Sequence, residues 1–170
     1  ERGQRDHQHP EQASGRDARV RLRAARLAAW YVRGHPRLEV AVITPYRAQV
    51  VLTQARLKDE GLSQAERERI HVGTVHTFQG SERDVVIWDL VETRNHAIGR
   101  LYRGRAGNRL ANVAITRAKG KLILLGDVRA FSDAPGSNTV GQLRAIISAG
   151  FPHSQRVKWN VFESILRNRM

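Results

Sequence analysis

Apolar residues along the chain recur with two spacings, one typical of helices and one of buried strands. Over residues 18–32 they follow steps of three and four, which predicts a helix that Gly34 and Pro36 bring to an end. Further helices are expected at residues 48–60, 109–118, 140–149 and 161–169. The helical pattern therefore returns along most of the chain.

Four short apolar runs lie between these helices and predict strands. They occupy residues 39–44, 71–75, 85–91 and 121–126. The runs are apolar on both faces, as expected for parallel strands covered by helices on both sides. Residues 62–69 are expected to form a charged connector, and the glycine-containing stretch 93–108 a long loop. The order of elements predicts an α/β fold.

Residues 1–16 carry no apolar period, so we expect a flexible tail or a cut end, followed by a single domain over residues 17–170. The HQH run in this tail has no cysteine or carboxylate spacing to support a metal site. Hydrophobic residues make up 41% of the 170 positions, enough for one domain with a core.

Composition also bears on location and partners. No apolar run approaches the roughly 20 residues that span a bilayer, and the start of the chain does not have the pattern of a secretory signal. Cysteine is absent, which excludes disulfides and thiolate metal sites and fits a cytoplasmic protein.

The net charge is +13, from 29 basic and 16 acidic residues, which favours a polyanionic partner. A GC-rich codon bias could replace surface lysine by arginine without any function. This alternative explains the ratio of arginine to lysine better than it explains the sign of the net charge.

Polar motifs stand where the predicted strands meet helices. "ITPYRAQ" follows the first strand, "TFQGSE" follows the second, and "NVAITRAKGK" leads into the last. Ligands of parallel α/β sheets bind beyond the carboxyl ends of the strands. We therefore expect all three motifs on one edge of the sheet, or facing it, in a composite site for phosphate and nucleic acid. The simpler alternative for each is a solvated loop.

Three longer stretches carry a resemblance. "VITPYRAQV", "GTVHTFQGSERDVVI" and "RLANVAITRAKGKLILLGD" resemble motifs IV, V and VI of superfamily 1 helicases, most closely the up-frameshift-type branch. They stand in the family's order over residues 40–127. The resemblance implies the second RecA-like domain of such an enzyme, with three α/β/α layers, a mostly parallel sheet and a P-loop NTPase fold that lacks the P-loop itself.

The sequence contains no G-x-x-x-x-G-K-[ST] loop, and no strand ends in an acidic pair suited to Mg²⁺. In the family both belong to the first RecA-like domain. The chain is therefore expected to be the C-terminal motor half of an ATP-dependent DNA or RNA helicase, cut from a longer protein. ATP and Mg²⁺ would be bound mainly by the N-terminal RecA-like domain, and single-stranded nucleic acid would be the other partner.

The resemblance also implies roles for residues that would meet ATP. Arg117 corresponds to the arginine finger that reaches the γ-phosphate, and it is the candidate catalytic residue. Glu82 corresponds to the acid that accepts hydrogen bonds from the ribose. Gly80 allows close backbone approach, Gln79 would couple nucleotide to nucleic acid, and Arg47 is a further candidate for phosphate. No residue is assigned to a metal.

For the nucleic-acid backbone, the resemblance implies contacts from Thr44, Pro45, Thr77 and Thr116. Simpler roles remain open for several positions. Thr44 could cap the helix that follows Pro45, which is compatible with a contact. Arg117 could pair with a surface acid, and Arg47 could be a solvated helix residue. Glu82 and Arg83 could both be loop charges.

Two functions follow from these observations. The first is the motor half of a superfamily 1 helicase, inactive in isolation. The second is a non-catalytic nucleic-acid-binding or regulatory module that retains the RecA-like fold. An upstream phosphate-binding loop in the full reading frame distinguishes the first from the second.

Overall fold

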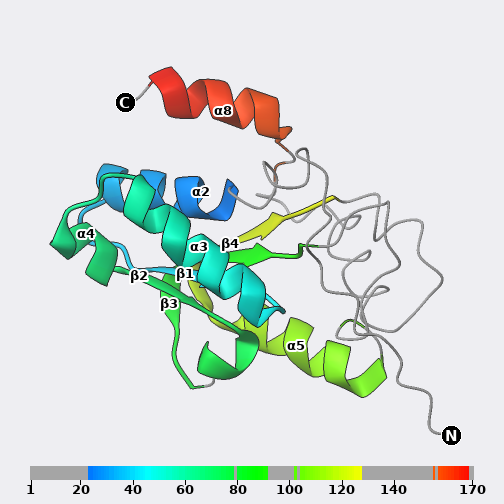
Figure 1. Cartoon of the computed structure of the whole chain (residues 1–170). Coiled ribbons are helices and arrows are strands. Elements are labelled where there is room, and N and C mark those ends of the chain that lie inside the picture. The colour runs from blue at the N-terminus through cyan, green and yellow to red at the C-terminus, as the bar shows by residue number, and fades with distance from the viewer. Residues whose placement is uncertain are drawn as a thin grey trace, which may run out of the picture.

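The apolar runs form a four-stranded sheet in which every neighbouring pair is parallel, in the order β2-β1-β3-β4 (Figure 1). The strands are β1 (Val40–Ile43), β2 (Ile70–Gly73), β3 (Arg83–Asp89) and β4 (Ala118–Leu125). The structure, a computed structural model, describes residues 23–78, 80–91, 102, 104–127, 155 and 157–168.

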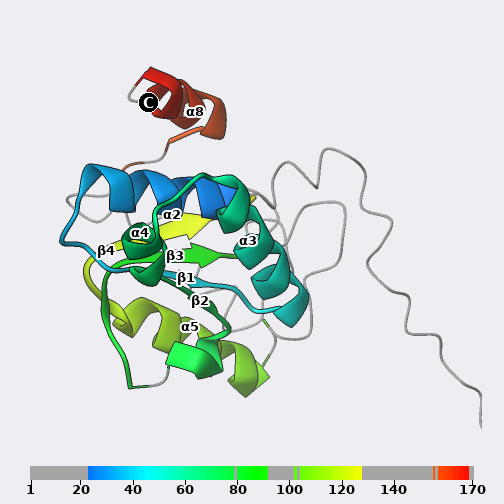
Figure 2. The ribbon, with the colours of Figure 1, turned by 60° about the vertical axis from the view of Figure 1, so that its left-hand side comes forward.

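Helices cover both faces of this sheet, so the described part of the chain has three layers (Figure 2). One face carries α2 (Arg23–Gly34) and α3 (Arg47–Asp59), and the other carries α5 (Gly104–Thr116) with the 3₁₀ helix η1 (Val75–Phe78). The predicted α/β fold with a parallel sheet between helical layers is therefore confirmed.

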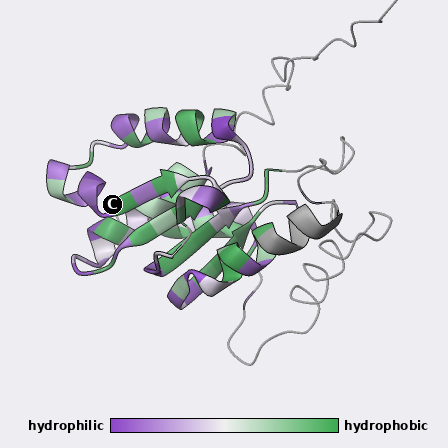
Figure 3. Ribbon diagram, turned by 90° about the horizontal axis from the view of Figure 1, so that it is seen from below, coloured by the Kyte–Doolittle hydropathy of each residue, from purple (hydrophilic) through white to green (hydrophobic). Residues whose placement is uncertain are grey.

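The strands are apolar on both sides because their side chains alternate between two cores. In β1, Ala41 and Ile43 pack with α5 and η1, whereas Val40 and Val42 pack with α2. All four are fully buried. Figure 3 shows the result, with mostly green strands between helices that carry both green and purple residues. A strand that alternated apolar and polar residues would have one polar face and could not be buried on both sides.

A last helix, α8 (Trp159–Asn168), lies outside α2 (Figures 1 and 2). The rings of Trp30 and Phe162 meet edge to face at 5.8 Å between centroids, and Arg26 forms a 2.8 Å ion pair with Glu163. None of the helices among the described residues is long and apolar enough to cross a membrane.

Several boundaries differ from those expected. The strand predicted at 71–75 ends at Gly73, and the chain turns into η1. Residues 62–69 are not merely a connector, because Gln64–Glu68 form α4. Ser63 caps this helix: its Oγ accepts from Glu66 N at 3.2 Å, while the Glu66 carboxylate accepts from Ser63 N at 2.8 Å. This S-x-x-E pattern is a helix-start signal that is visible in the sequence.

The predicted loop 93–108 is also wrong in part, because α5 begins at Gly104 rather than at Arg109. Glycine costs only about 1 kcal/mol in a helix interior, and packing of an amphipathic face offsets that cost. Leu110, Ala111 and Ala114 provide such a face against the sheet. The predicted tail 1–16 and the helix 140–149 lie outside the described residues.

Candidate functional site

The sheet has two edges, and the predicted site residues divide between them. We call the side of the sheet at which the strands end the carboxyl edge; Thr44–Arg47 and η1 lie there, after β1 and β2. We call the side at which the strands begin the amino edge; β3 and β4 begin there at Arg83 and Ala118, which are paired in the sheet. The expectation that all three motifs meet at one edge is wrong. Arg117 lies just before the start of β4, and Thr44 lies just after the end of β1. Because these strands run parallel, the two residues are at opposite edges.

A backbone hydrogen bond joins two of the motifs at the amino edge. Arg83 N donates to Arg117 O at 2.9 Å, so the end of "TFQGSE" and the centre of "NVAITRAKGK" lie side by side. Glu82, one residue before Arg83, is exposed, and Arg117 is half-buried. An acidic and a basic side chain from separate motifs are thus presented at the same edge.

The Arg117 side chain is held at the corner between α5 and β4. Its Nη2 donates to Thr116 Oγ1 at 3.1 Å, and that hydroxyl donates to Asn112 O at 2.8 Å. Within the described residues, Arg117 forms no ion pair, and its buried Nε has no hydrogen-bond partner. The alternative of a surface ion pair for Arg117 therefore finds no partner in this part of the chain.

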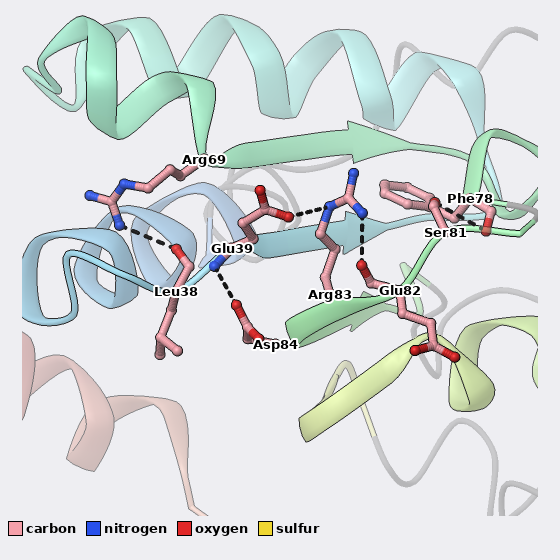
Figure 4. A network of polar contacts seen from close by, with 8 residues as sticks. All are labelled: Leu38, Glu39, Arg69, Phe78, Ser81, Glu82, Arg83 and Asp84. Carbon is pink, nitrogen blue, oxygen red and sulfur yellow. Dashed lines mark hydrogen bonds and ion pairs between the residues drawn. The ribbon is translucent and has the colours of Figure 1, made fainter.

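Gly80 and Ser81 carry the chain toward the amino edge. Gly80 has a φ of +83°, which a residue with a side chain adopts only with strain. Ser81 N donates to Phe78 O at 3.2 Å. The Glu82 carboxylate points away from Arg83, whose Nη1 instead donates to the carbonyl of Glu82 at 2.7 Å (Figure 4). The carboxylate is therefore left facing solvent.

Neighbouring charges fix the beginnings of the strands (Figure 4). Arg83 Nε lies 3.3 Å from Glu39 Oε2, an ion pair without the alignment of a hydrogen bond. Glu39 N donates to Asp84 Oδ2 at 2.8 Å. Arg83 is thus part of β3 and helps to fix its start, rather than being a loop charge.

Burial lowers the pKa of nearby His71, the Arg83 charge lowers it further, and Glu39 opposes both.

Arg69 is a second anchor, and sequence reasoning missed it. Its guanidinium donates to Val32 O at 2.8 Å, to His35 O at 3.0 Å and to Leu38 O at 3.2 Å. These carbonyls belong to the end of α2 and to the turn that leads into β1. The only sequence signal was a cation directly before an apolar run, which does not reveal partners more than 30 residues away.

At the carboxyl edge, Thr44 and Pro45 are both buried, Thr44 completely. Thr44 N donates to Gly73 O at 3.1 Å, and its Oγ1 has no hydrogen-bond partner among the described residues. The N-cap residue of α3 is Tyr46, and its side chain does not form the capping hydrogen bond to the first turn of the helix. The alternative of Thr44 as the helix cap is therefore wrong.

Thr77 is exposed at the same edge and rests on Gly73. A Cβ added at Gly73 would lie 2.8 Å from Thr77 Cβ and 2.9 Å from Thr77 Oγ1. Real Cβ atoms do not tolerate such distances, so the glycine is what allows the Thr77 side chain to lie against the end of β2.

Two residues lie away from the groups in which they were predicted. Arg47, expected with the ATP residues, is exposed in the first turn of α3 at the carboxyl edge. The four-residue strand β1 separates the edges by roughly 13 Å. Thr116, expected with the nucleic-acid residues, bonds to Arg117 at the amino edge. Gln79 lies outside the described residues.

A buried polar pair at the carboxyl edge was also missed. Gln49 Nε2 donates to Asp89 Oδ2 at 2.9 Å, and both residues are almost fully buried. The sequence signal was a single acid at the end of an apolar run, "VVIWDL". No pattern in the sequence linked it to a glutamine 40 residues earlier.

The described residues contain no group of three or more His, Cys, Asp or Glu side chains that could hold a metal ion. Two carboxylates at the amino edge, those of Glu39 and Asp84, are already engaged with Arg83 and with Glu39 N.

A family model described as an AAA domain matches residues 15–129, more than half of the chain. The match covers all three motifs and all four strands. It also matches the α/β architecture with a parallel sheet.

Curated relatives are similar over about half of the chain. "DNA polymerase alpha-associated DNA helicase A" of Schizosaccharomyces pombe is 38% identical over 90 residues, 52% of this chain and 12% of the relative. "DNA replication ATP-dependent helicase/nuclease DNA2" of Bos taurus is 36% identical over 97 residues, 57% and 8% respectively. "Regulator of nonsense transcripts 1 homolog" of Arabidopsis thaliana is 37% identical over 101 residues, again 57% and 8%. The matched region is thus a small part of each relative.

Proposed function

Because the chain belongs to the AAA domain family, whose model matches residues 15–129, we propose that it is the C-terminal motor half of an ATP-dependent superfamily 1 helicase. Relatives whose names include a helicase or an ATP-dependent helicase support the family-level activity. ATP and Mg²⁺ would be bound mainly by an N-terminal RecA-like domain that packs against the amino edge. That nucleotide supplies the phosphoryl group that is transferred to water.

One observation carries this proposal: the hydrogen bond from Arg83 N to Arg117 O. It brings the exposed Glu82 carboxylate and the Arg117 guanidinium to the same edge from different motifs. Arg117, without an ion-pair partner among the described residues, is suited to stabilise negative charge on a phosphoryl group. Glu82 is suited to accept hydrogen bonds from ribose hydroxyls, and Gly80 lies two residues before it in the chain.

The carboxyl edge is proposed to hold single-stranded nucleic acid. Thr77 is an exposed residue, Arg47 offers an exposed cation, and Thr44 has a buried hydroxyl without a partner among the described residues. Pro45 would form the floor of this surface. The net charge of +13 adds a general attraction to phosphate. The position of Arg47 favours nucleic acid over ATP as its ligand, and that of Thr116 favours a role beside Arg117.

Nucleotide hydrolysis by the full-length gene product, with saturating single-stranded nucleic acid, tests the motor function. Arg117→Ala should lower kcat about a thousandfold or more, as for other arginine fingers, with a much smaller change in nucleotide binding. Arg56→Ala is the matched control, since Arg56 is an exposed arginine on α3 whose ion-pair partner is Asp59. A near-normal kcat for Arg117→Ala would refute the assignment.

The chain purified alone should hydrolyse no ATP. It should bind single-stranded oligonucleotides weakly, with an affinity that falls as salt rises because phosphate contacts release counterions. Mg²⁺-dependent turnover by the isolated chain that is lost on Arg117→Ala would contradict the first expectation. A salt-independent affinity would contradict the second.

The high positive charge also fits the second candidate, a nucleic-acid-binding or regulatory module without ATPase activity. The two candidates differ in what the full reading frame encodes. A Walker A loop upstream of this chain supports the motor, whereas its absence from the full-length protein supports the module.

A further inference from the structure

The proposed function leaves one buried acid unexplained. Asp89 ends β3 at the carboxyl edge and is only 3% exposed. Its Oδ2 accepts from Gln49 Nε2 at 2.9 Å, and its Oδ1 accepts from Val91 N at 3.2 Å. Burying a carboxyl group is unfavourable unless it is well hydrogen-bonded. These bonds therefore fix where Asp89, Gln49 and Val91 can lie.

The turn that follows Asp89 is strained. Val91 has a φ of +63°, a conformation that β-branched residues rarely adopt. Such strain persists only where the surroundings hold it in place. Leu90 N donates to Leu125 O at 2.8 Å, and Leu90 O accepts from Tyr102 Oη at 2.7 Å. The turn over residues 89–91 is thus a fixed point of the carboxyl edge.

Gln49 connects this fixed point to α3. It lies in the first turn of α3, where its backbone N donates to Tyr46 O at 3.1 Å. β1 pairs with β3 through Ile43 and Trp88, the residues just before Thr44 and Asp89. Strand pairing and the side-chain bond therefore hold the corner of residues 44–47 from two sides.

We propose that Asp89 and Gln49 form a positioning pair, which holds the corner of residues 44–47 in the geometry that contacts a nucleic-acid phosphate. This inference rests on the proposed nucleic-acid function. Neither residue contacts the nucleic acid in this proposal. They act through Thr44 and Arg47, whose backbone they connect to the strained turn at residues 89–91.

The test is to swap the amide group of Gln49 with the carboxyl group of Asp89. Gln49→Glu replaces the donating amide by a second carboxyl group of the same shape, which breaks the bond to Asp89. Asp89→Asn alone should be mild, because the Gln49 amide can turn to present its oxygen. The double variant Gln49→Glu/Asp89→Asn restores a donor and an acceptor in exchanged positions. Thr53→Val, on the same buried face of α3, serves as the control.

Binding of a fluorescent single-stranded oligonucleotide is measured for this chain at several salt concentrations. Gln49→Glu should weaken binding about tenfold, equivalent to one hydrogen bond to a charged group. The slope of log affinity against log salt should become shallower by about 0.7 for each phosphate that the protein no longer neutralises. The double variant should recover both, and Thr53→Val should change neither. A variant that only unfolds more often loses affinity equally at all salt concentrations and keeps its slope.

Amide hydrogen exchange gives a readout independent of ligand. In Gln49→Glu the amides of Thr44, Val50 and Val91 should exchange faster, and the double variant should return them to the original rates. Unchanged exchange, an unchanged salt slope, or failure of the double variant to recover would each overturn the positioning pair while leaving the proposed function intact. Absence of binding by the unsubstituted chain to both DNA and RNA would instead refute the nucleic-acid function and this inference with it.

Discussion

The two edges of the sheet use polar residues in opposite ways. At the amino edge, charged side chains are exposed or half-buried, and Glu82 and Arg117 form no ion pair among the described residues. At the carboxyl edge, Thr44, Gln49 and Asp89 are 0%, 4% and 3% exposed. Exposed charges can respond to a ligand's charge, whereas buried polar groups mainly fix geometry. The amino edge therefore presents mainly exposed and half-buried charges, whereas the carboxyl edge combines the exposed Arg47 with a buried polar framework that fixes geometry.

The comparison predicts different kinetic defects for the two exposed charges of the amino edge in the full-length protein. Arg117→Lys should still lower kcat by about a hundredfold, because a compact ammonium does not reproduce the planar fork of a guanidinium. Glu82→Ala should raise KM more than it lowers kcat, because ribose contacts persist throughout the cycle. Steady-state ATPase assays separate the two. Equal effects on kcat and KM in both variants would contradict the distinct roles.

Replacing one glycine at each edge by alanine compares the effect of the two edges on the free energy of unfolding and on oligonucleotide binding. Gly73→Ala at the carboxyl edge should destabilise the chain by about 1–3 kcal/mol through overpacking against Thr77, and it should weaken oligonucleotide binding. Gly80→Ala has open space around its Cβ but a positive φ. It should destabilise by about 1 kcal/mol and leave oligonucleotide binding unchanged. Denaturant unfolding and binding titrations measure both. An unchanged oligonucleotide affinity in Gly73→Ala would show that the Thr77 side chain does not need to pack against Gly73 for binding.

A matched pair of hydroxyls tests whether Thr44 serves a ligand. Thr44 and Thr53 are both fully buried with no hydrogen-bond partner for Oγ1 among the described residues. Either Thr→Val change should raise the free energy of unfolding by about 1 kcal/mol, because an unpaired hydroxyl is no longer buried. Only Thr44→Val should weaken binding of a single strand. Loss of stability in both variants would mean that both hydroxyls have partners.

The smallest expected effect is a pH dependence that arises at the amino edge. The pKa of His71 is lowered from 6.5 in the folded chain, first by burial and then by Arg83. The unfolded chain therefore binds the proton more readily, so the free energy of unfolding should decrease as the pH falls below 6.5. His71→Gln should reduce this decrease, as measured by thermal unfolding between pH 7.5 and about 5.5. The same slope in both proteins would contradict the assignment to His71.

Sequence reasoning succeeded where a local pattern was sufficient. The four apolar runs became four strands, and the order of motifs indicated a parallel sheet between helices. It failed where topology decides: whether Arg117 and Thr44 share an edge depends on which end of a strand each residue adjoins. The Gln49–Asp89 pair, 40 residues apart, had no signature that a single sequence reveals. The start of α5 at Gly104 has no local sequence signal, because glycine disfavours a helix and the packing that offsets this cost is tertiary.

The segment over residues 74–82 has a mechanical consequence. The chain leaves β2 at Thr74 and forms η1 (Val75–Phe78), and residues 80–82 lead into the start of β3 at the other edge (Figure 1). Covalent backbone hardly stretches, and η1 is seated on α5. If the proposed function holds, we expect a displacement of Glu82 on nucleotide binding to be passed through η1 to Thr77. Inserting one glycine after Gly80 should weaken this coupling, so that ATP hydrolysis proceeds without movement along the nucleic acid.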